Sequence, residues 1–273
     1  MTDPLKPPIK VIAWSVPRSL SSVFTQCLCS RGNAEVFFES FATAAHGGPE
    51  KIYKTPGTVP NTVREPAHTF QYVKDNLEAD YPGRKLVFLK GMAYAVDGRY
   101  DKLPEGFIHT FLIRHPAHVF PSQVKLAKSY PPMFGEISYK ELIPVPGETY
   151  KEQWDLFQHV TEVLKQEAIV VDANDLVATP GATMKAYCDK IGYPYSDDML
   201  TWEPDQVNKH KWHIANSQVM ANTFLGMYKR AFESTCFVGG AKKEINYENE
   251  SDEVKASIEF CLPFYEKLAK YKV

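Results

Sequence analysis

The sequence has little net charge, few cysteines and no long apolar run. Its 31 Lys and Arg residues against 33 Asp and Glu residues leave a formal net charge of −2, so no global field favours nucleic acid or an anionic membrane. No apolar stretch approaches the roughly 20 residues that a membrane-spanning helix requires, and the first residues lack the layout of a secretion signal. We therefore expect a cytoplasmic protein that binds no nucleic acid and does not span a membrane.

The five cysteines are too few and too scattered for a disulfide framework. Cys27 and Cys29 are separated by one residue, which is closer than the two-residue spacing usual in zinc sites, and they lie in a helical pattern. We expect buried free thiols in a reducing compartment. Since no cluster of His, Cys and carboxylate residues indicates a metal site, we also expect no metal cofactor.

Short apolar strands alternate with helical patterns, which is typical of a mostly parallel sheet covered by helices on both faces. The expected strands are 9–14, 34–38, 85–90, 107–113 and 168–171. The expected helices are 20–31, 66–79, 116–129, 148–167, 183–191, and two near 217–233 and 251–271. Loop-rich insertions are expected at about 40–66 and 130–147. Because no linker or repeat divides the chain, we predict a single three-layer α/β/α domain over residues 1–273.

The turn after the first expected strand is rich in hydroxyl groups and carries one cation. In parallel α/β sheets, ligands bind at the carboxyl ends of the strands, and N–H groups at a helix start attract phosphate. Ser19, Ser21 and Ser22 can donate to phosphoryl oxygens, and Arg18 can contact two of them at once. The alternative is a serine that caps the helix beside a solvated Arg18. The Gly-x-x-x-x-Gly-Lys-Ser/Thr motif is absent, which argues against ATP or GTP hydrolysis.

A second candidate anion site follows the fourth expected strand. Arg114 stands where this strand stops, and Ser122 follows eight residues later, about two helical turns on. A cation and a hydroxyl so placed can hold a second phosphate beside the first. The alternative is an arginine paired with a nearby carboxylate.

Together these segments resemble the sulfotransferases that use 3′-phosphoadenosine-5′-phosphosulfate (PAPS). Pro17-Arg-Ser-Leu-Ser-Ser22 is similar to the turn that holds the 5′-phosphosulfate in that family. The segment from Arg114 to Ser122 is similar to the one whose Arg and Ser hold the 3′-phosphate. Residues 168–183, with the helix after them, resemble a third family segment. The resemblance covers roughly residues 9–195 and implies a P-loop-type fold, PAPS as donor, 3′,5′-adenosine bisphosphate (PAP) as product and no metal.

The resemblance also implies residue roles. The donor would be bound by Arg18, Ser19, Leu20, Ser21, Ser22, Arg114 and Ser122. Arg18 matches the family's catalytic cation and would stabilise the bridging oxygen, and Lys90 matches a lysine of the cytosolic enzymes. Leu20 replaces the usual glycine, so we expect that turn position to be reached without a positive φ. The family's last phosphate-binding loop has no clear copy, although residues 239–243 are a candidate.

The sequence defines the general base less well. Two residues after Lys90, where the cytosolic enzymes carry a histidine, this chain has Met92. Glu39 ends the second expected strand and would face the same crevice, and its phenylalanine neighbours favour a carboxylate that readily accepts a proton. We predict Glu39 as the base, the alternative being a cap or salt bridge for the following loop. Other candidate bases are His46, His210 and His213.

We therefore predict an enzyme that moves a sulfuryl group from PAPS to a hydroxyl, rather than an amine, of a small or medium apolar acceptor. The loop-rich insertions contain residues suited to an apolar pocket: Phe41, Tyr53, Tyr130, Met133, Phe134 and Tyr139. Two alternatives stay open. One is a P-loop nucleotide hydrolase or kinase, and the other is a non-catalytic PAP-binding protein, with which Met92 is consistent. The oligomeric state does not follow from the sequence.

Overall fold

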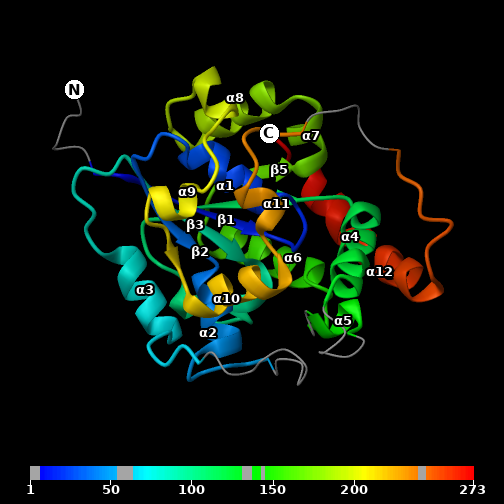
Figure 1. The fold of residues 1–273 in the computed structure, drawn as a ribbon. Coiled ribbons are helices and arrows are strands. Elements are labelled where there is room, and N and C mark those ends of the chain that lie inside the picture. Colours follow the sequence, from blue (N-terminus) through cyan, green and yellow to red (C-terminus); the bar gives the residue numbers. More distant parts are fainter. Residues whose placement is uncertain (1–6, 54–63, 131–136, 143–144, 239–243) are drawn as a thin grey trace.

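A six-stranded sheet forms the centre of the computed structural model, which describes residues 7–53, 64–130, 137–142, 145–238 and 244–273 (Figure 1). The strand order is β5-β4-β1-β3-β2-β6, and every pairing between these strands is parallel. The strands are β1 (Ile9–Ser15), β2 (Ala34–Phe38), β3 (Leu86–Met92), β4 (Ile108–Ile113), β5 (Val170–Asp172) and β6 (His213–Ile214). All their carboxyl ends therefore meet at one edge.

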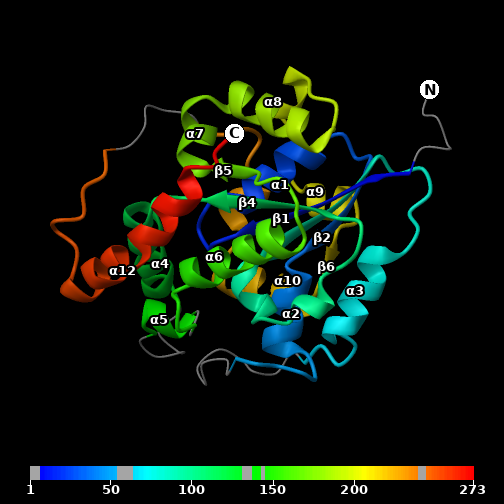
Figure 2. The same cartoon turned by 180° about the vertical axis from the view of Figure 1, so that it is seen from behind.

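Helices cover both faces of this sheet (Figures 1 and 2). The longer ones are α1 (Ser21–Cys29), α2 (Ser40–Gly47), α3 (Phe70–Glu78), α4 (Pro116–Lys128), α6 (Tyr150–Gln158), α8 (Pro180–Ile191), α10 (Asn216–Leu225) and α12 (Asp252–Ala269). The shorter ones are α5 (Tyr139–Leu142), α7 (Ala173–Ala178), α9 (Gln206–Lys209) and α11 (Lys229–Phe232). Three layers result, in agreement with the predicted α/β class.

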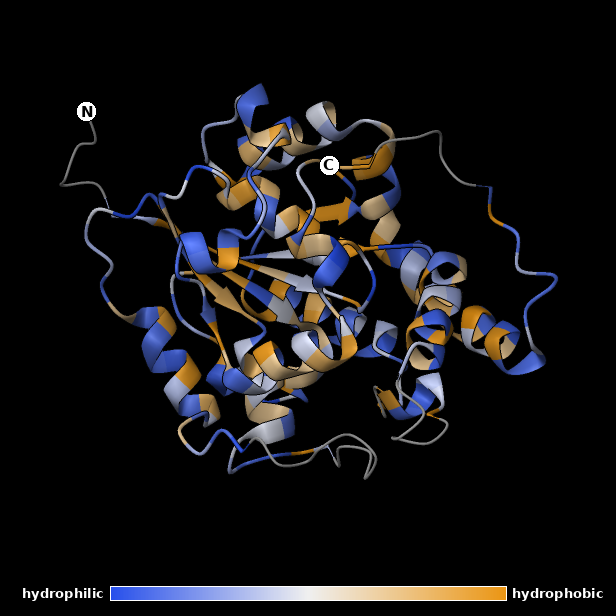
Figure 3. Cartoon of the chain, in the orientation of Figure 1, coloured by the Kyte–Doolittle hydropathy of each residue, from blue (hydrophilic) through white to orange (hydrophobic). Residues whose placement is uncertain are grey.

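Alternate residues of β1 enter two different cores. Ile12 and Trp14 pack on the face covered by α2, α3 and α6, whereas Val11 and Ala13 pack on the face covered by α1 and α8. A strand with helices on both sides is expected to bury both sets of side chains. Apolar residues accordingly concentrate along the strands and the inner sides of the helices (Figure 3). The prediction of a mostly parallel sheet between helical layers is confirmed.

Several local predictions were wrong. The segment 40–66 was expected to be loop-rich, but its first residues form α2, whose Phe41 and alanines are buried against the sheet. Alanine is the strongest helix former, and Gly48 ends the helix. The helix expected over 148–167 is α-helical only from Tyr150 to Gln158, and a single π-helical turn, His159–Val163, follows it. In the insertion at 130–147, residues 139–142 form α5.

Further short elements were not predicted, β6 and α7 among them. The two-residue strand β6 pairs with β2 through Phe37 and Phe38, and α7 fills the segment between β5 and α8. Both elements are short, and pairing with the sheet decides β6 more than its own sequence does. No helix in the described part of the chain is long and apolar enough to cross a membrane. All five cysteines are free and four are buried, as predicted, but Cys236 is exposed.

Candidate active site

Parallel topology gathers the predicted site residues at one edge of the sheet. Arg18 follows β1, Glu39 follows β2, Lys90 lies near the end of β3 and Arg114 follows β4. Lys90 stands in register with both Ala13 of β1 and Phe38 of β2. The carboxyl ends of four strands thus contribute one charged residue each, in the position where parallel α/β sheets bind ligands.

The turn between β1 and α1 has an unusual backbone. Arg18 has a φ of 63° and Leu20 a φ of 65°, so the expectation that Leu20 avoids the left-handed region was wrong. Its carbonyl accepts the first helical hydrogen bond, from the Phe24 N–H, at 2.9 Å. Ser19 is fully buried, and its hydroxyl donates to the Val16 carbonyl at 2.7 Å. This bond tightens the turn and offsets part of the strain of two left-handed residues.

The amino end of α1 is open. Among the described residues no side chain caps it, so the alternative of a capping serine is not what the structure has. Ser21 is 5% exposed, and Ser22 is partly exposed, both in the first turn. The N–H groups of a first turn have no partner within their own helix. The amino end of α1 can therefore bind an anion that lies at the carboxyl edge of the sheet.

The two predicted anion sites adjoin. Arg18 donates from Nε to Ser122 Oγ at 3.1 Å, and Arg114 donates from Nη1 to the Arg18 carbonyl at 2.7 Å. Burial lowers the pKa of both guanidinium groups, and in Arg114 the nearby charge of Arg18 acts in the same direction. Arg114 Nε is buried and has no hydrogen-bond partner among the described residues. Two desolvated cations held this close favour binding of an anion.

The helix that carries Ser122 is fixed at its start by a histidine. The Nδ1 atom of His115 accepts from the Ala117 N–H at 3.2 Å and caps α4, whose first residue is Pro116. His118 contacts Asn174 through Nδ1 at 3.0 Å. These two histidines, which depart from the family pattern, hold the backbone around Arg114.

Glu39 and Lys90 form a buried ion pair. Lys90 is 1% exposed and donates from Nζ to Glu39 Oε1. The Tyr228 hydroxyl donates to the other oxygen, Oε2, at 2.8 Å, and Gln218 Nε2 donates to the Glu39 carbonyl at 3.3 Å. The carboxylate thus has polar surroundings, unlike the apolar ones expected from its phenylalanine neighbours. Burial lowers the pKa of Lys90, and the Glu39 carboxylate offsets part of that shift.

The structure places the candidate histidines differently from one another. His46 Nε2 lies 3.1 Å from the Tyr94 hydroxyl, and burial lowers its pKa to about 4, so the ring is neutral at pH 7. His210 lies against Gly32, before β2 begins. His213 is exposed and pairs with Glu35. The charge of Glu39 opposes the lowering of the His46 pKa.

Sequence reasoning missed the segment that covers this edge. Met227 accepts from Arg18 Nη1 through its carbonyl at 3.3 Å, next to the Tyr228 that contacts Glu39. Gln26 of α1 anchors the segment by donating to the Ala231 carbonyl. In Figure 1, α10 and α11 both lie in front of the sheet. The only sequence signal was a Tyr-Lys-Arg run after Gly226, and nothing in it points to Glu39.

The predicted apolar acceptor pocket does not form as one unit in the described structure. Phe41 and Tyr53 are buried in the core beneath α2, whereas Tyr139 packs in a separate cluster with α4 and α12. Tyr130 is 8% exposed at the end of α4. Met133 and Phe134, like the candidate loop 239–243, lie outside the described residues.

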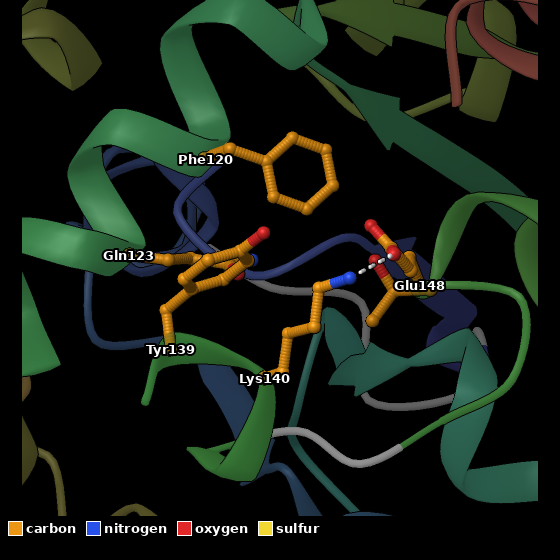
Figure 4. A pocket seen from close by; sticks show the side chains of 6 residues that line it. Phe120, Gln123, Tyr139, Lys140 and Glu148 are labelled. Atoms are coloured by element: carbon orange, nitrogen blue, oxygen red, sulfur yellow. Dashed lines mark ion pairs between the residues drawn. The ribbon is translucent and has the colours of Figure 1, made fainter. Parts of the chain in front are cut away.

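A small cavity lies between α4, α5 and the start of α6 (Figure 4). It is lined by Phe120, Gln123, Tyr139, Lys140, Glu148 and Thr149, and Lys140 pairs with Glu148 at 3.3 Å. Its volume of about 20 Å³ suits a single water molecule. The cavity is therefore too small to be the acceptor site. Within the described ranges, no group of three or more His, Cys, Asp and Glu residues is placed to hold a metal ion.

The fold is a parallel α/β sheet, and two arginines contact each other at the carboxyl ends of its strands, where such sheets bind ligands. A model of the sulfotransferase domain family matches residues 9–270. The chain belongs to this family of sulfotransferase domains.

The chain is similar to a curated protein and to two solved sulfotransferase domains. The Arabidopsis thaliana protein called branched-chain-amino-acid aminotransferase-like protein 2 is 29% identical over 195 residues, which are 70% of this chain and 31% of that protein. The chain thus spans about a third of that relative's length. The sulfotransferase domain of the Synechococcus PCC 7002 olefin synthase is 13% identical, with a TM-score of 0.48 over 97% of this chain and 96% of its own. The sulfotransferase domain of the curacin biosynthetic pathway is 16% identical, with a TM-score of 0.49 over 93% and 97%.

Proposed function

We propose that this chain transfers a sulfuryl group from PAPS to a hydroxyl, rather than an amine, of a small or medium apolar acceptor. The observation that carries the proposal is the contact between the two predicted anion sites, through Arg18, Ser122 and Arg114. PAPS bears a phosphosulfate on its 5′ side and a phosphate at its 3′ position. A donor with two anionic ends needs two adjoining cationic sites.

The residues at this edge fit such a donor. Ser19, Leu20, Ser21 and Ser22 form the turn and the open first turn of α1, which suits the 5′ end. Arg114 and Ser122 suit the 3′-phosphate, because the buried Arg114 Nε has no partner among the described residues. A guanidinium binds a phosphate best through two parallel N–H donors, and this atom would supply one of them.

The donor supplies a sulfuryl group attached to a phosphate leaving group, and the chain's task is to stabilise charge and remove a proton. Arg18 would stabilise the negative charge that grows on the leaving oxygen, a contribution of about 3–4 kcal/mol for a preorganised donor. Glu39 would accept the acceptor's proton, and Lys90 fixes one of its oxygens. Met92 is 8% exposed and its sulfur accepts from the Ser15 hydroxyl at 3.5 Å. It packs there and leaves the base role to Glu39.

We assign the reaction to the cytoplasm, with a small molecule as the acceptor partner and with no nucleic acid. Five free cysteines, four of them buried, support a reducing compartment. The near-zero net charge supports the exclusion of nucleic acid. The acceptor's class rests on Glu39, because a neutral hydroxyl is a weak nucleophile that needs a base as it attacks, whereas an uncharged amine can attack first and lose its proton afterwards.

Two measurements test the proposal together. The melting temperature is recorded with PAP, ADP and ATP, and the conversion of PAPS to PAP is followed by chromatography with and without a panel of phenols and aliphatic alcohols. We expect PAP to stabilise the fold most and an alcohol or phenol to accelerate the conversion. Greater stabilisation by ATP with Mg²⁺, together with phosphate release, would instead identify a nucleotide hydrolase or kinase. Stabilisation by PAP without conversion would identify a non-catalytic PAP-binding protein.

A further inference from the structure

Tyr228 connects the proposed leaving-group cation with the proposed base. The carbonyl of the preceding residue, Met227, accepts from Arg18 Nη1 at 3.3 Å. The Tyr228 hydroxyl donates to Glu39 Oε2 at 2.8 Å. The two adjacent residues Met227 and Tyr228 therefore contact both Arg18 and Glu39. In the proposed reaction the acceptor oxygen attacks between these two groups.

Both oxygens of the Glu39 carboxylate are already engaged. Lys90 donates to Oε1, and both Tyr228 and, at 3.5 Å, Gln218 Nε2 donate to Oε2. These two donors engage both lone pairs of Oε2, so an acceptor hydroxyl that contacted this oxygen directly would have to displace one of them. A phenol oxygen, however, accepts a hydrogen bond while it donates one. An acceptor can therefore reach Glu39 through Tyr228 without breaking either contact.

The Tyr228 ring is held by neighbours other than Glu39. It packs edge-on against Phe38, with ring centroids 5.0 Å apart, and in a tilted arrangement against Phe232, with centroids 5.5 Å apart. Lys90 Nζ lies 6.0 Å from the ring centroid. Burial raises the pKa of Tyr228, and the Glu39 carboxylate acts in the same direction. The phenol therefore keeps its proton at neutral pH, which suits a group that passes a proton on.

Building on the proposed sulfotransferase function, we propose that Tyr228 is a catalytic residue that relays the acceptor's proton to Glu39. The acceptor oxygen forms its bond to sulfur while its O–H proton moves to Tyr228 Oη. The Tyr228 hydroxyl proton moves at the same time to Glu39 Oε2. The bond between sulfur and the phosphate oxygen breaks, and its electron pair stays on the phosphate of PAP. Glu39 later releases the proton to solvent, so the step needs no further reactant.

The test is Tyr228→Phe, which keeps the ring and removes the hydroxyl. Single-turnover conversion of PAPS to PAP is measured with water, phenol and 4-nitrophenol as acceptors. We expect the rate to fall about 100-fold with phenol, the lower end of the effect of a positioned proton-transfer group. The loss should shrink with 4-nitrophenol, whose more acidic proton needs less help. The rise in melting temperature with PAP should match that of the wild type.

A positioning role is separated by solvent isotope effects and by a matched variant. If two protons move in the rate-limiting step, a plot of the wild-type rate constant against the D₂O fraction lies below a straight line. For Tyr228→Phe, in which one proton moves, we expect that plot to be linear. Gln218→Met removes the hydrogen bonds that the Gln218 amide donates to the Glu39 carbonyl at 3.3 Å and to Oε2 at 3.5 Å, without removing the proposed proton path. We expect it to lower the rate less than Tyr228→Phe does, and by the same factor for every acceptor. Glu39→Gln combined with Tyr228→Phe should be no slower than the slower single variant, because both act in one proton path.

The outcomes separate the relay from the function on which it rests. A wild type that converts PAPS, with Tyr228→Phe equally fast, overturns the relay alone. An equal loss in Gln218→Met and Tyr228→Phe, independent of the acceptor's acidity, also overturns it, because Tyr228 would then only position Glu39. A wild type that converts no PAPS overturns the proposed function and the relay together.

Discussion

Arg18 and Ser122 are separated by 104 positions in the chain and joined by a hydrogen bond of 3.1 Å. Arg18 lies in the turn after β1, and Ser122 lies in the second turn of α4, the helix that follows β4. Since β1 and β4 are neighbours in the sheet, their carboxyl ends carry these two segments to the same place. The hydrogen bond joins the two sequence motifs at one edge of the sheet. In the proposed function, each motif binds its own end of the donor, and the two ends can be tested separately.

Replacing Arg18 by alanine should remove most of the turnover. The guanidinium would stabilise charge on the leaving oxygen, so we expect PAPS-to-PAP conversion to fall by about 10²–10³-fold. Arg18→Lys should recover only part of the rate, because an ammonium cannot contact Ser122 and the donor with two parallel N–H groups. Arg84→Ala is the matched control, because it also removes a guanidinium, one that pairs with Glu35 and lies before β3, away from the carboxyl ends of the strands. Arg18→Ala turnover equal to that of the control would refute the catalytic role.

Replacing Arg114 by alanine should weaken binding of the 3′-phosphate selectively. Hydrogen bonds to charged groups contribute about 1.5–3 kcal/mol, which is roughly 10–100-fold in the Kd of PAP. The Kd of adenosine 5′-phosphosulfate, which lacks that phosphate, should change much less. Calorimetric titration with both ligands measures the difference.

The control for this comparison is Tyr150→Phe. It removes the hydrogen bond of 2.7 Å that the Tyr150 hydroxyl donates to the Arg114 carbonyl and leaves the guanidinium in place. We expect it to weaken PAP and adenosine 5′-phosphosulfate equally. An Arg114→Ala protein that loses both ligands to the same extent would show that Arg114 does not distinguish the 3′-phosphate.

Local sequence patterns were sufficient for the parallel sheet and for the two arginine turns. The uninterrupted apolar strands require burial on both faces, and the eight-residue spacing of Arg114 and Ser122 depends on one strand end and one helix. The left-handed conformation of Leu20 did not follow, because the tertiary turn, and not the residue's own preference, decides it. The same holds for β6, whose two residues pair with β2 only after the chain has folded back.

The residues that complete the candidate site could not be predicted from the sequence. Tyr228 donates to Glu39 across 189 positions, and Arg18 donates to the Met227 carbonyl across 209. No spacing rule connects residues so far apart, and α10 and α11 carry no local motif. Lys90 was identified by its position on a strand, but its pairing with Glu39 depends on the register of β2 beside β3.

Breaking the buried pair of Lys90 and Glu39 should cost stability as well as rate. Lys90→Met leaves the Glu39 carboxylate buried without its cation, and losing one partner of a buried pair typically costs about 3–5 kcal/mol of unfolding free energy. Lys90→Met combined with Glu39→Gln should recover much of that loss, because no unpaired charge remains. Urea unfolding at pH 7 measures the free energy of unfolding of the wild type, Lys90→Met and the double variant. A double variant as unstable as Lys90→Met would show that the pair's charge is not what stabilises the fold.

Acid should destabilise the fold through a histidine remote from the site. Trp14 donates from Nε1 to His109 Nδ1 at 2.9 Å, and His109 is 1% exposed. Burial, with a smaller contribution from His159, lowers its pKa to about 4, whereas the unfolded chain has the ordinary value of about 6.5. Between these values the unfolded state binds a proton that the folded state does not. The contribution to stability is therefore complete above about pH 6.5 and is lost as the pH falls towards 4.

The expected size of this loss is about 3 kcal/mol between pH 7 and pH 4, since each pKa unit corresponds to about 1.4 kcal/mol. His109→Gln is the comparison, because its amide oxygen can accept from Trp14 and does not titrate. Urea unfolding at pH 7, 6, 5 and 4 gives the free energy for both proteins. The wild type should lose more stability than His109→Gln over this range, because the other titrating groups, His46 included, are common to both. Parallel curves would mean that His109 is protonated equally in the folded and unfolded chains, and that burial does not hold it neutral.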